Sequence, residues 1–159
     1  MTVVYFWDLG NVQVPSRTTA DVVIMKLVER YGRGRFFVVG DEDMYEDTVS
    51  QLKKFQDVTF YGTTGKQRAE ELLIYEMNRK RLYCKTLQTV VLLSGEYRFA
   101  SPIFRMPNQV TTAVIHRAGH INDILRKAVD ETETIENLCD LHTITVKPSK
   151  SRWYTCEIL

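Results

Sequence analysis

The stretch Val3-Val4-Tyr5-Phe6-Trp7-Asp8 is an uninterrupted apolar run that ends in a carboxylate. Such a run predicts a strand buried on both faces, which is typical of a parallel sheet covered by helices. Ligands of these sheets bind at the carboxyl ends of the strands. We therefore expect Asp8 to lie at the mouth of a sheet, where a metal ion or a reacting phosphate could bind.

The rest of the chain alternates between strand and helix patterns. Further strands are expected at residues 36–39, 58–61, 89–93 and 110–115, and helices at 20–31, 45–55, 66–83, 99–106 and 121–129. This order predicts an α/β three-layer sandwich over residues 1–139, with a mostly parallel five-stranded sheet. Residues 140–159 break the alternation, and we expect a short hairpin-like extension packed on the same domain.

Composition limits the classes of function. The chain has 159 residues and a net charge of +1, so a site for a polyanion would have to be a local patch. Three scattered cysteines fit neither a disulfide framework nor a zinc site and indicate reduced thiols in an intracellular protein of the cytoplasm or nucleus. The first apolar run is too short to cross a membrane, so we expect no membrane association.

Glu70 stands out in the helix expected at residues 66–83. On a helical wheel it falls within the apolar face, whereas Glu71 falls outside it. A buried carboxylate is costly unless it is paired or binds a metal. Glu70 is therefore either a metal ligand or the partner of an ion pair, with Lys66 one turn earlier or with a neighbour across the sheet.

A second acidic segment, Ser94-Gly95-Glu96-Tyr97-Arg98-Phe99, follows the strand expected at residues 89–93. A glycine there allows a tight turn that presents Ser94 and Glu96 together at the sheet mouth. Capping of the next helix is the alternative role for Glu96, as it is for Asp8. Asp41 follows another strand and is a weaker candidate on the rim. Acids that converge repel one another unless a divalent cation such as Mg²⁺ or Mn²⁺ neutralises them.

Three segments together resemble the NYN family, limkain type, of the PIN-like ribonucleases. They are Phe6 to Pro15, Lys66 to Glu71 and Ser94 to Ala100, and the resemblance covers about residues 1–135. It implies a PIN-like fold and a divalent-metal-dependent endoribonuclease that acts on single-stranded RNA in RNA processing or silencing.

The resemblance also implies roles for individual residues. Asp8, Glu70 and Glu96 would hold Mg²⁺ or Mn²⁺, and Asn11 and Ser94 would orient water or phosphate beside them. The cations expected to contact RNA are Lys66, Arg98, Arg79, Lys80 and Arg81. Cations near a helix C-terminus also complement the helix dipole, so the last three have a simpler explanation as solvated side chains.

The chain departs from the family pattern at four positions. Glu70 and Glu96 stand where aspartate is usual, Arg98 stands where the family has Asp or Asn, and Gly10 stands where an acid is common in the limkain type. Two ligands are thus one methylene longer, and Arg98 would either neutralise an acid or hold an RNA phosphate. These departures support a second hypothesis, a catalytically degenerate pseudo-nuclease that binds RNA, a protein partner or a second copy of itself as a scaffold. A small-molecule module is disfavoured because no G-x-G-x-x-G loop is present.

Overall fold

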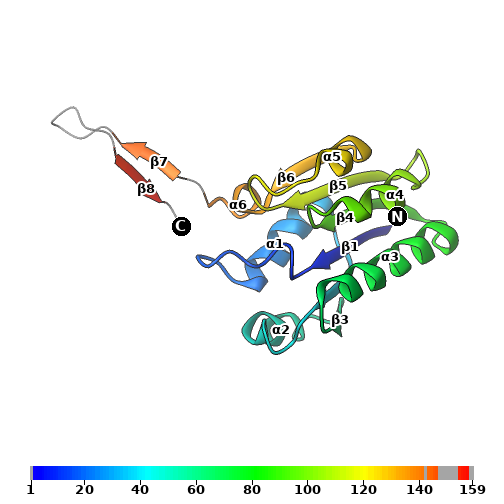
Figure 1. Ribbon diagram of the computed structural model, residues 1–159, viewed down its shortest axis with the longest axis horizontal. Helices are drawn as coiled ribbons and strands as arrows, with labels where there is room; N and C mark the ends of the chain where they lie inside the picture. The colour runs from blue at the N-terminus through cyan, green and yellow to red at the C-terminus, as the bar shows by residue number, and fades with distance from the viewer. Residues whose placement is uncertain (1, 142, 147–153, 158–159) are drawn as a thin grey trace.

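The computed structural model describes residues 2–141, 143–146 and 154–157. Its centre is a parallel six-stranded sheet in the order β3-β2-β1-β4-β5-β6 (Figure 1). The strands are β1 (Thr2–Asp8), β2 (Gly34–Gly40), β3 (Val58–Gly62), β4 (Leu87–Leu93), β5 (Thr111–His116) and β6 (Glu131–Thr134). The strand that carries the opening apolar run, β1, lies in the interior of the sheet between β2 and β4.

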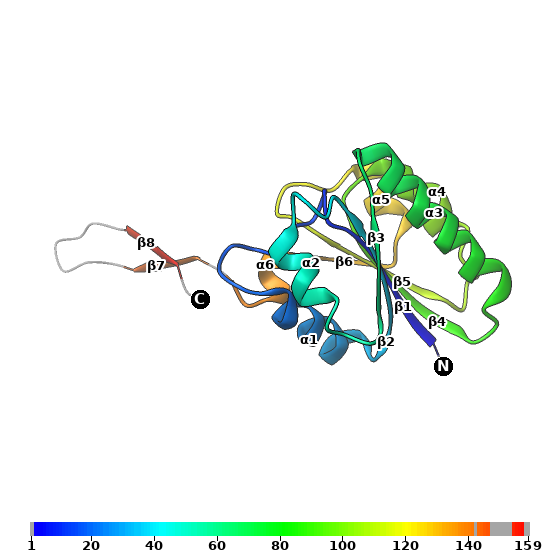
Figure 2. The same ribbon diagram turned by 90° about the horizontal axis from the view of Figure 1, so that it is seen from below.

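Helices cover both faces of this sheet, as Figure 2 shows. The helices are α1 (Ala20–Tyr31), α2 (Glu46–Leu52), α3 (Lys66–Tyr83), a 3-10 turn at Tyr97–Phe99, α4 (Ala100–Phe104), α5 (Asp123–Ala128) and α6 (Ile135–Leu138). The first two lie with α6 on one face, and α3, α4 and α5 lie on the other. The expected α/β three-layer class is confirmed. In the part of the chain that the structure describes, no helix is both long and apolar enough to cross a membrane.

The side chains of β1 alternate between two hydrophobic cores. Tyr5 and Trp7 pack on the α1 side, whereas Val4 and Phe6 pack on the α3 side. All four are at most 1% exposed, so the strand is buried on both faces as its sequence predicts. Asp8 continues the even-numbered series, and its place in the pleat therefore directs it to the α3 side.

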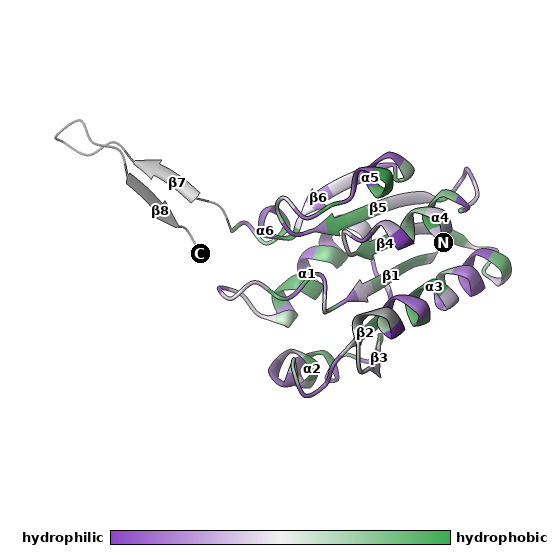
Figure 3. Ribbon diagram, viewed as in Figure 1, coloured by the Kyte–Doolittle hydropathy of each residue, from purple (hydrophilic) through white to green (hydrophobic). Residues whose placement is uncertain are grey.

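The expected count of five strands is wrong, because β6 adds a sixth beside β5. Its sequence is Glu131-Thr132-Glu133-Thr134, which lacks the apolar run or alternation that predicts a strand. An edge strand has only one neighbour and need not be buried, so polar side chains are tolerated there. Figure 3 shows the contrast between the pale to purple β6 and the green of β5.

The long helix expected at residues 121–129 is also wrong in extent. The helix α5 covers only Asp123–Ala128. It begins where the side chain of Asn122 accepts a hydrogen bond from the N–H of Ile124, at 2.8 Å. It ends because Val129 adopts an extended conformation that leads directly into β6.

The C-terminal extension contains the expected hairpin strands. These are β7 (Thr143–Val146) and β8 (Tyr154–Glu157), which pair antiparallel with each other in a separate two-stranded sheet. Figures 1 and 2 draw them as an arm beyond α6. That this extension packs on the domain stays a prediction.

Candidate functional site

The buried strand β1 delivers Asp8 to the carboxyl edge of the sheet. The side chain is 1% exposed, and its Oδ1 accepts a hydrogen bond from the N–H of Gly10 at 3.2 Å. The crossover after β1 runs through α1 on one face, whereas α3 leads to β4 across the other face. Asp8 therefore lies where the order of the strands reverses, which is the usual place for a ligand site in such sheets.

Asn11 joins the loop after β1 to the loop after β4. Its Oδ1 accepts a hydrogen bond from the N–H of Gly95 at 2.7 Å, and its Nδ2 donates to Oε1 of Glu96 at 3.0 Å. Ser94 is fully buried, and its Oγ accepts from the N–H of Glu96 at 3.2 Å. Asn11, Ser94 and Glu96 thus lie together with Asp8 at the carboxyl edge of the sheet, which we call the mouth. Their contacts fix the conformation of the loop after β4.

Glu70 is buried on α3 and paired with an arginine. It is 3% exposed, whereas Glu71 is exposed, as the helical wheel predicts. The guanidinium of Arg98 donates to its Oε2 at 3.0 Å. Of the alternatives that the sequence leaves open, the structure shows an ion pair with a residue that follows another strand. The side chain of Lys66 lies outside the described part of the chain.

The acids at the mouth do not match the donor set of a divalent cation in this arrangement. The Oε2 of Glu70 is held by Arg98, and the Oε1 of Glu96 is held by Asn11. Among the described residues, no group of three or more His, Cys, Asp or Glu side chains is placed so that it could hold a metal ion. A cation that takes six or more oxygen ligands would need these contacts to rearrange or water to supply most of its ligands.

A hollow of about 220 Å³ opens beside Asp8 between the ends of β1, β2 and β3. It is lined by Asp8, Gly10, Gly40, Asp41, Met44, Tyr45, Thr63, Gly65 and Ala69. The Oδ1 of Asp41 accepts from the N–H groups of Asp43 and Met44, at 3.0 and 3.2 Å, so Asp41 stabilises the turn before α2. Thr63 is a buried polar residue that the sequence reasoning missed. Thr63 directly follows β3, much as Asp8 ends β1, and this position could have identified it.

The remaining cationic candidates lie farther along α3. Lys80 is ten residues beyond Glu70, which corresponds to about 15 Å along a helix. Arg79 forms an ion pair with Glu76 at 3.4 Å, and Arg81 donates to Asn78 at 3.5 Å. The structure therefore separates these cations from the acidic mouth, and among the predicted RNA contacts whose side chains are described it joins only Arg98 to it.

Comparisons with known proteins give a distant sequence relationship and a clear likeness of fold. The chain is 27% identical over 139 residues to Meiosis regulator and mRNA stability factor 1 of Mus musculus and 26% identical to that of Bos taurus. The match covers 76% of this chain in each case, and the chain spans about 8% of the length of these relatives. No protein-family model matches the chain.

A crystal structure of a protein of unknown function from Vibrio parahaemolyticus shares the fold. Its TM-score is 0.62 at 12% sequence identity, and the superposition covers 86% of this chain and 94% of that one. The fold is thus one that another chain of little sequence similarity also adopts. The sequence similarity to Meiosis regulator and mRNA stability factor 1 is weak but extends over about three quarters of this chain.

Proposed function

We propose that this domain binds single-stranded RNA at the mouth of its sheet without cleaving it. One observation carries the proposal: at the position where the acidic site is expected, the guanidinium of Arg98 lies on the buried carboxylate of Glu70. The arginine supplies within the chain the positive charge that a metal ion would bring. The second hypothesis from the sequence, a degenerate nuclease with a binding role, is therefore the one that the geometry favours.

Arg98 retains the means to bind a phosphate while it pairs with Glu70. A guanidinium has five N–H donors, and the hydrogen bond from Nη1 to Oε2 of Glu70 uses one of them. The Arg98 side chain is 33% exposed, so part of the group faces solvent. Arginine binds phosphate with paired, charge-assisted hydrogen bonds, which makes it the natural contact for an RNA backbone at this point.

The choice of RNA as ligand is supported by the relatives. Both matching proteins are mRNA stability factors by name, and the match covers 76% of this chain. The chain spans only about 8% of the length of those proteins. A role in RNA processing or silencing, and the binding of a protein partner or of a second copy, stay predictions.

A binding and cleavage assay on the same RNA tests the proposal. A labelled unstructured oligoribonucleotide is titrated with protein and followed by anisotropy, and parallel samples with Mg²⁺, Mn²⁺ or EDTA are analysed for cleavage. We expect saturable binding that is unchanged by EDTA and no cleavage in any sample. Metal-dependent cleavage would support the nuclease hypothesis instead, and absence of binding would reject both.

A pair of matched variants locates the binding to the mouth. Arg98→Gln removes the cation at the site and is expected to weaken RNA binding. Arg126→Gln makes the same change at an exposed residue of α5 whose ion pair with Asp123 lies on the surface. It is expected to leave the affinity within about twofold, because one surface charge outside the contact is largely screened by salt. Equal effects of both variants would mean that binding is a general charge effect.

A further inference from the structure

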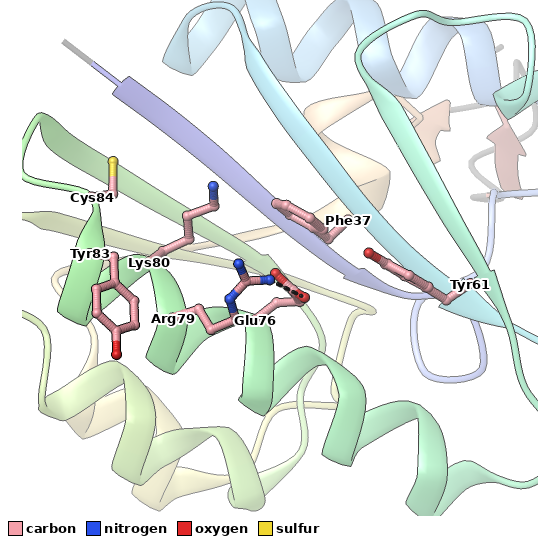
Figure 4. Close-up of a pocket in the computed structure, with 7 residues that line it drawn as sticks. All are labelled: Phe37, Tyr61, Glu76, Arg79, Lys80, Tyr83 and Cys84. Carbon is pink, nitrogen blue, oxygen red and sulfur yellow. Dashed lines mark hydrogen bonds and ion pairs between the residues drawn. The ribbon is translucent and has the colours of Figure 1, made fainter.

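A second hollow lies between the sheet and the last turns of α3, on the same face as Glu70 but farther along the helix. It has a volume of about 390 Å³ and is lined by Phe37, Tyr61, Glu76, Arg79, Lys80, Tyr83 and Cys84. Figure 4 shows Phe37 and Tyr61 on the strands facing the side chains of α3 across it. We call it the α3 groove. Its volume is within the range of about 300–1,000 Å³ typical of small-ligand sites.

The α3 groove combines aromatic rings with cations. Phe37 is 7% exposed and forms part of its floor, whereas Tyr83 is 76% exposed at its edge. The Nζ of Lys80 lies 5.4 Å from the centroid of the Phe37 ring. None of the ion pairs found among the described residues involves Lys80, so its charge is not neutralised by a carboxylate.

These features match the chemistry of one nucleotide within a single strand. Every base has a π face that can stack on an aromatic side chain, and every linkage carries a phosphate that a cation can hold. Arg79 and Lys80 lie on neighbouring positions of α3, and the next residue, Arg81, adds a third cation to this end of the helix. Arg79 is paired with Glu76, another lining residue of the groove, so Lys80 supplies the positive charge that favours an anionic ligand.

We propose that the α3 groove binds a nucleotide of the same RNA strand that contacts the mouth. Tyr83 and Tyr61 supply surfaces on which the base stacks, and Lys80 with Arg79 holds the adjoining phosphate. The inference rests on the proposed RNA-binding function and adds a second contact about 15 Å from Glu70 along α3. The strand would then follow the helix from the mouth towards its C-terminal end.

Two groove variants and one control test this contact by RNA-binding titration. Tyr83→Ala removes an exposed ring whose loss does not open the core, and it should weaken binding by about fivefold or more. Lys80→Gln should weaken binding and lower the slope of log affinity against log salt by about 0.7. Lys54→Gln makes the same charge change at an exposed residue just after α2, the helix that covers the other face of the sheet, and should change affinity by less than about twofold.

An oligonucleotide with abasic positions separates stacking from charge. Tyr83→Ala should leave the affinity for the abasic strand unchanged, whereas Lys80→Gln should weaken it, because the phosphates remain.

The outcomes separate the two proposals. If the unaltered protein binds RNA and both groove variants bind within twofold of it, the α3 groove is not a contact and the mouth alone stands. If the unaltered protein binds no RNA, both proposals fail. If Tyr83→Ala weakens binding of normal and abasic strands equally, the base does not stack on Tyr83 and the groove binds phosphate only, which overturns the nucleotide site.

Discussion

Arg98 and Glu70 form the contact that most affects the properties of the mouth. Glu70 is 3% exposed, so its charge has lost most of its hydration and depends on its partner. Arg98 is 33% exposed and can meet both the carboxylate and an incoming phosphate. The pair therefore links the stability of the fold to the function that we propose for the site.

Removing one member of this pair should cost more than removing both. We expect Arg98→Met to lower the free energy of unfolding by about 1–3 kcal/mol, because it leaves a buried carboxylate without its counter-charge. The double variant Glu70→Gln, Arg98→Met should recover part of this loss. Urea denaturation of the four proteins in the cycle gives the coupling energy.

The exposed pair of Arg126 and Asp123 is the control for this cycle. Its N–O distance is 3.2 Å and both side chains are more than half exposed. Arg126→Met should therefore change stability by less than about 0.5 kcal/mol. A coupling energy between Arg98 and Glu70 below about 0.5 kcal/mol would show that the buried pair contributes no more to stability than an exposed one.

Gly95 should not tolerate a side chain. A Cβ at this position would lie 1.8 Å from the carbonyl oxygen of His120, which is backbone and cannot move without displacing its loop. We expect Gly95→Ala to lower stability by about 2 kcal/mol or more. Gly62→Ala is the matched control, because the nearest atoms to its Cβ lie at 3.8 Å. Thermal melts of both variants give the comparison, and equal melting temperatures would contradict the close approach.

The edge strand β6 is held to helix α1 by an ion pair. Arg30 donates to Oε2 of Glu133 at 2.9 Å. Burial alone raises the pKa of Glu133, but hydrogen bonds from Arg30, Asn137 and the N–H of Thr134 outweigh it, so the pKa lies below its usual value. This contact stabilises a strand that has few apolar residues of its own.

The lowered pKa of Glu133 gives the direction of a pH effect. Since the folded state favours the ionised form, the stabilisation is present above the unfolded pKa of about 4.3 and is lost as pH falls through the folded pKa. We expect Glu133→Gln to be less stable than the unaltered protein at pH 7, because it loses the ion pair with Arg30. The loss should be only about 1 kcal/mol, since Arg30 is partly exposed and solvent screens the pair. The difference should shrink below about pH 4.

Denaturation at several pH values checks this expectation. Glu71→Gln changes an exposed glutamate on α3 and should show no comparable difference at any pH. A loss of stability in Glu133→Gln that stays the same at pH 7 and pH 3 would mean that the ionised carboxylate is not its cause.

The distribution of charge over the molecule bears on how it would bind RNA. The net charge is +1, so affinity for a polyanion must come from local groups such as Arg98 and the cations of α3. Binding should therefore depend on salt through a small number of contacts. The salt dependence of RNA binding therefore tests whether a few local cations make the contacts. A protein of high net positive charge would instead bind any polyanion.

Placing aspartate at positions 96 and 98, as in the NYN family that the sequence resembles, tests RNA binding and RNA cleavage separately. In the double variant Glu96→Asp, Arg98→Asp, we expect weaker RNA binding and a flatter salt dependence, because a phosphate contact is lost. We expect no cleavage with Mn²⁺, since shorter ligands alone do not rebuild a site that demands close placement. On the same folded sample, titration measures RNA affinity, calorimetry measures Mn²⁺ affinity, and a cleavage assay measures nuclease activity.

A control with the same chemical changes at exposed positions accompanies it, namely Glu71→Asp with Arg126→Asp. RNA affinity equal to that of this control would show that Arg98 is not a phosphate contact. Cleavage that appears with Mn²⁺ in the double variant alone would show that the fold keeps the geometry of a nuclease and that two residues suppress it.

Local sequence determined five of the six strands of the sheet and the burial of several key side chains. The opening apolar run predicts the doubly buried strand β1, and the helical wheel distinguishes buried Glu70 from exposed Glu71. The predicted helix at residues 66–83 matches α3, and Gly32 ends α1 with a φ of +105°. These features follow from periodicity and backbone preference, which short stretches of chain encode by themselves.

Tertiary packing determined the sixth strand and the pairing of the site. β6 has a polar sequence and becomes a strand because β5 offers an unpaired edge beside it. Arg98 meets Glu70 across 28 positions of sequence, and Asn11 meets Glu96 across 85. A periodic pattern shows that Glu70 is buried but cannot show which group neutralises it. That choice depends on which loops the order of the strands brings together at one edge of the sheet.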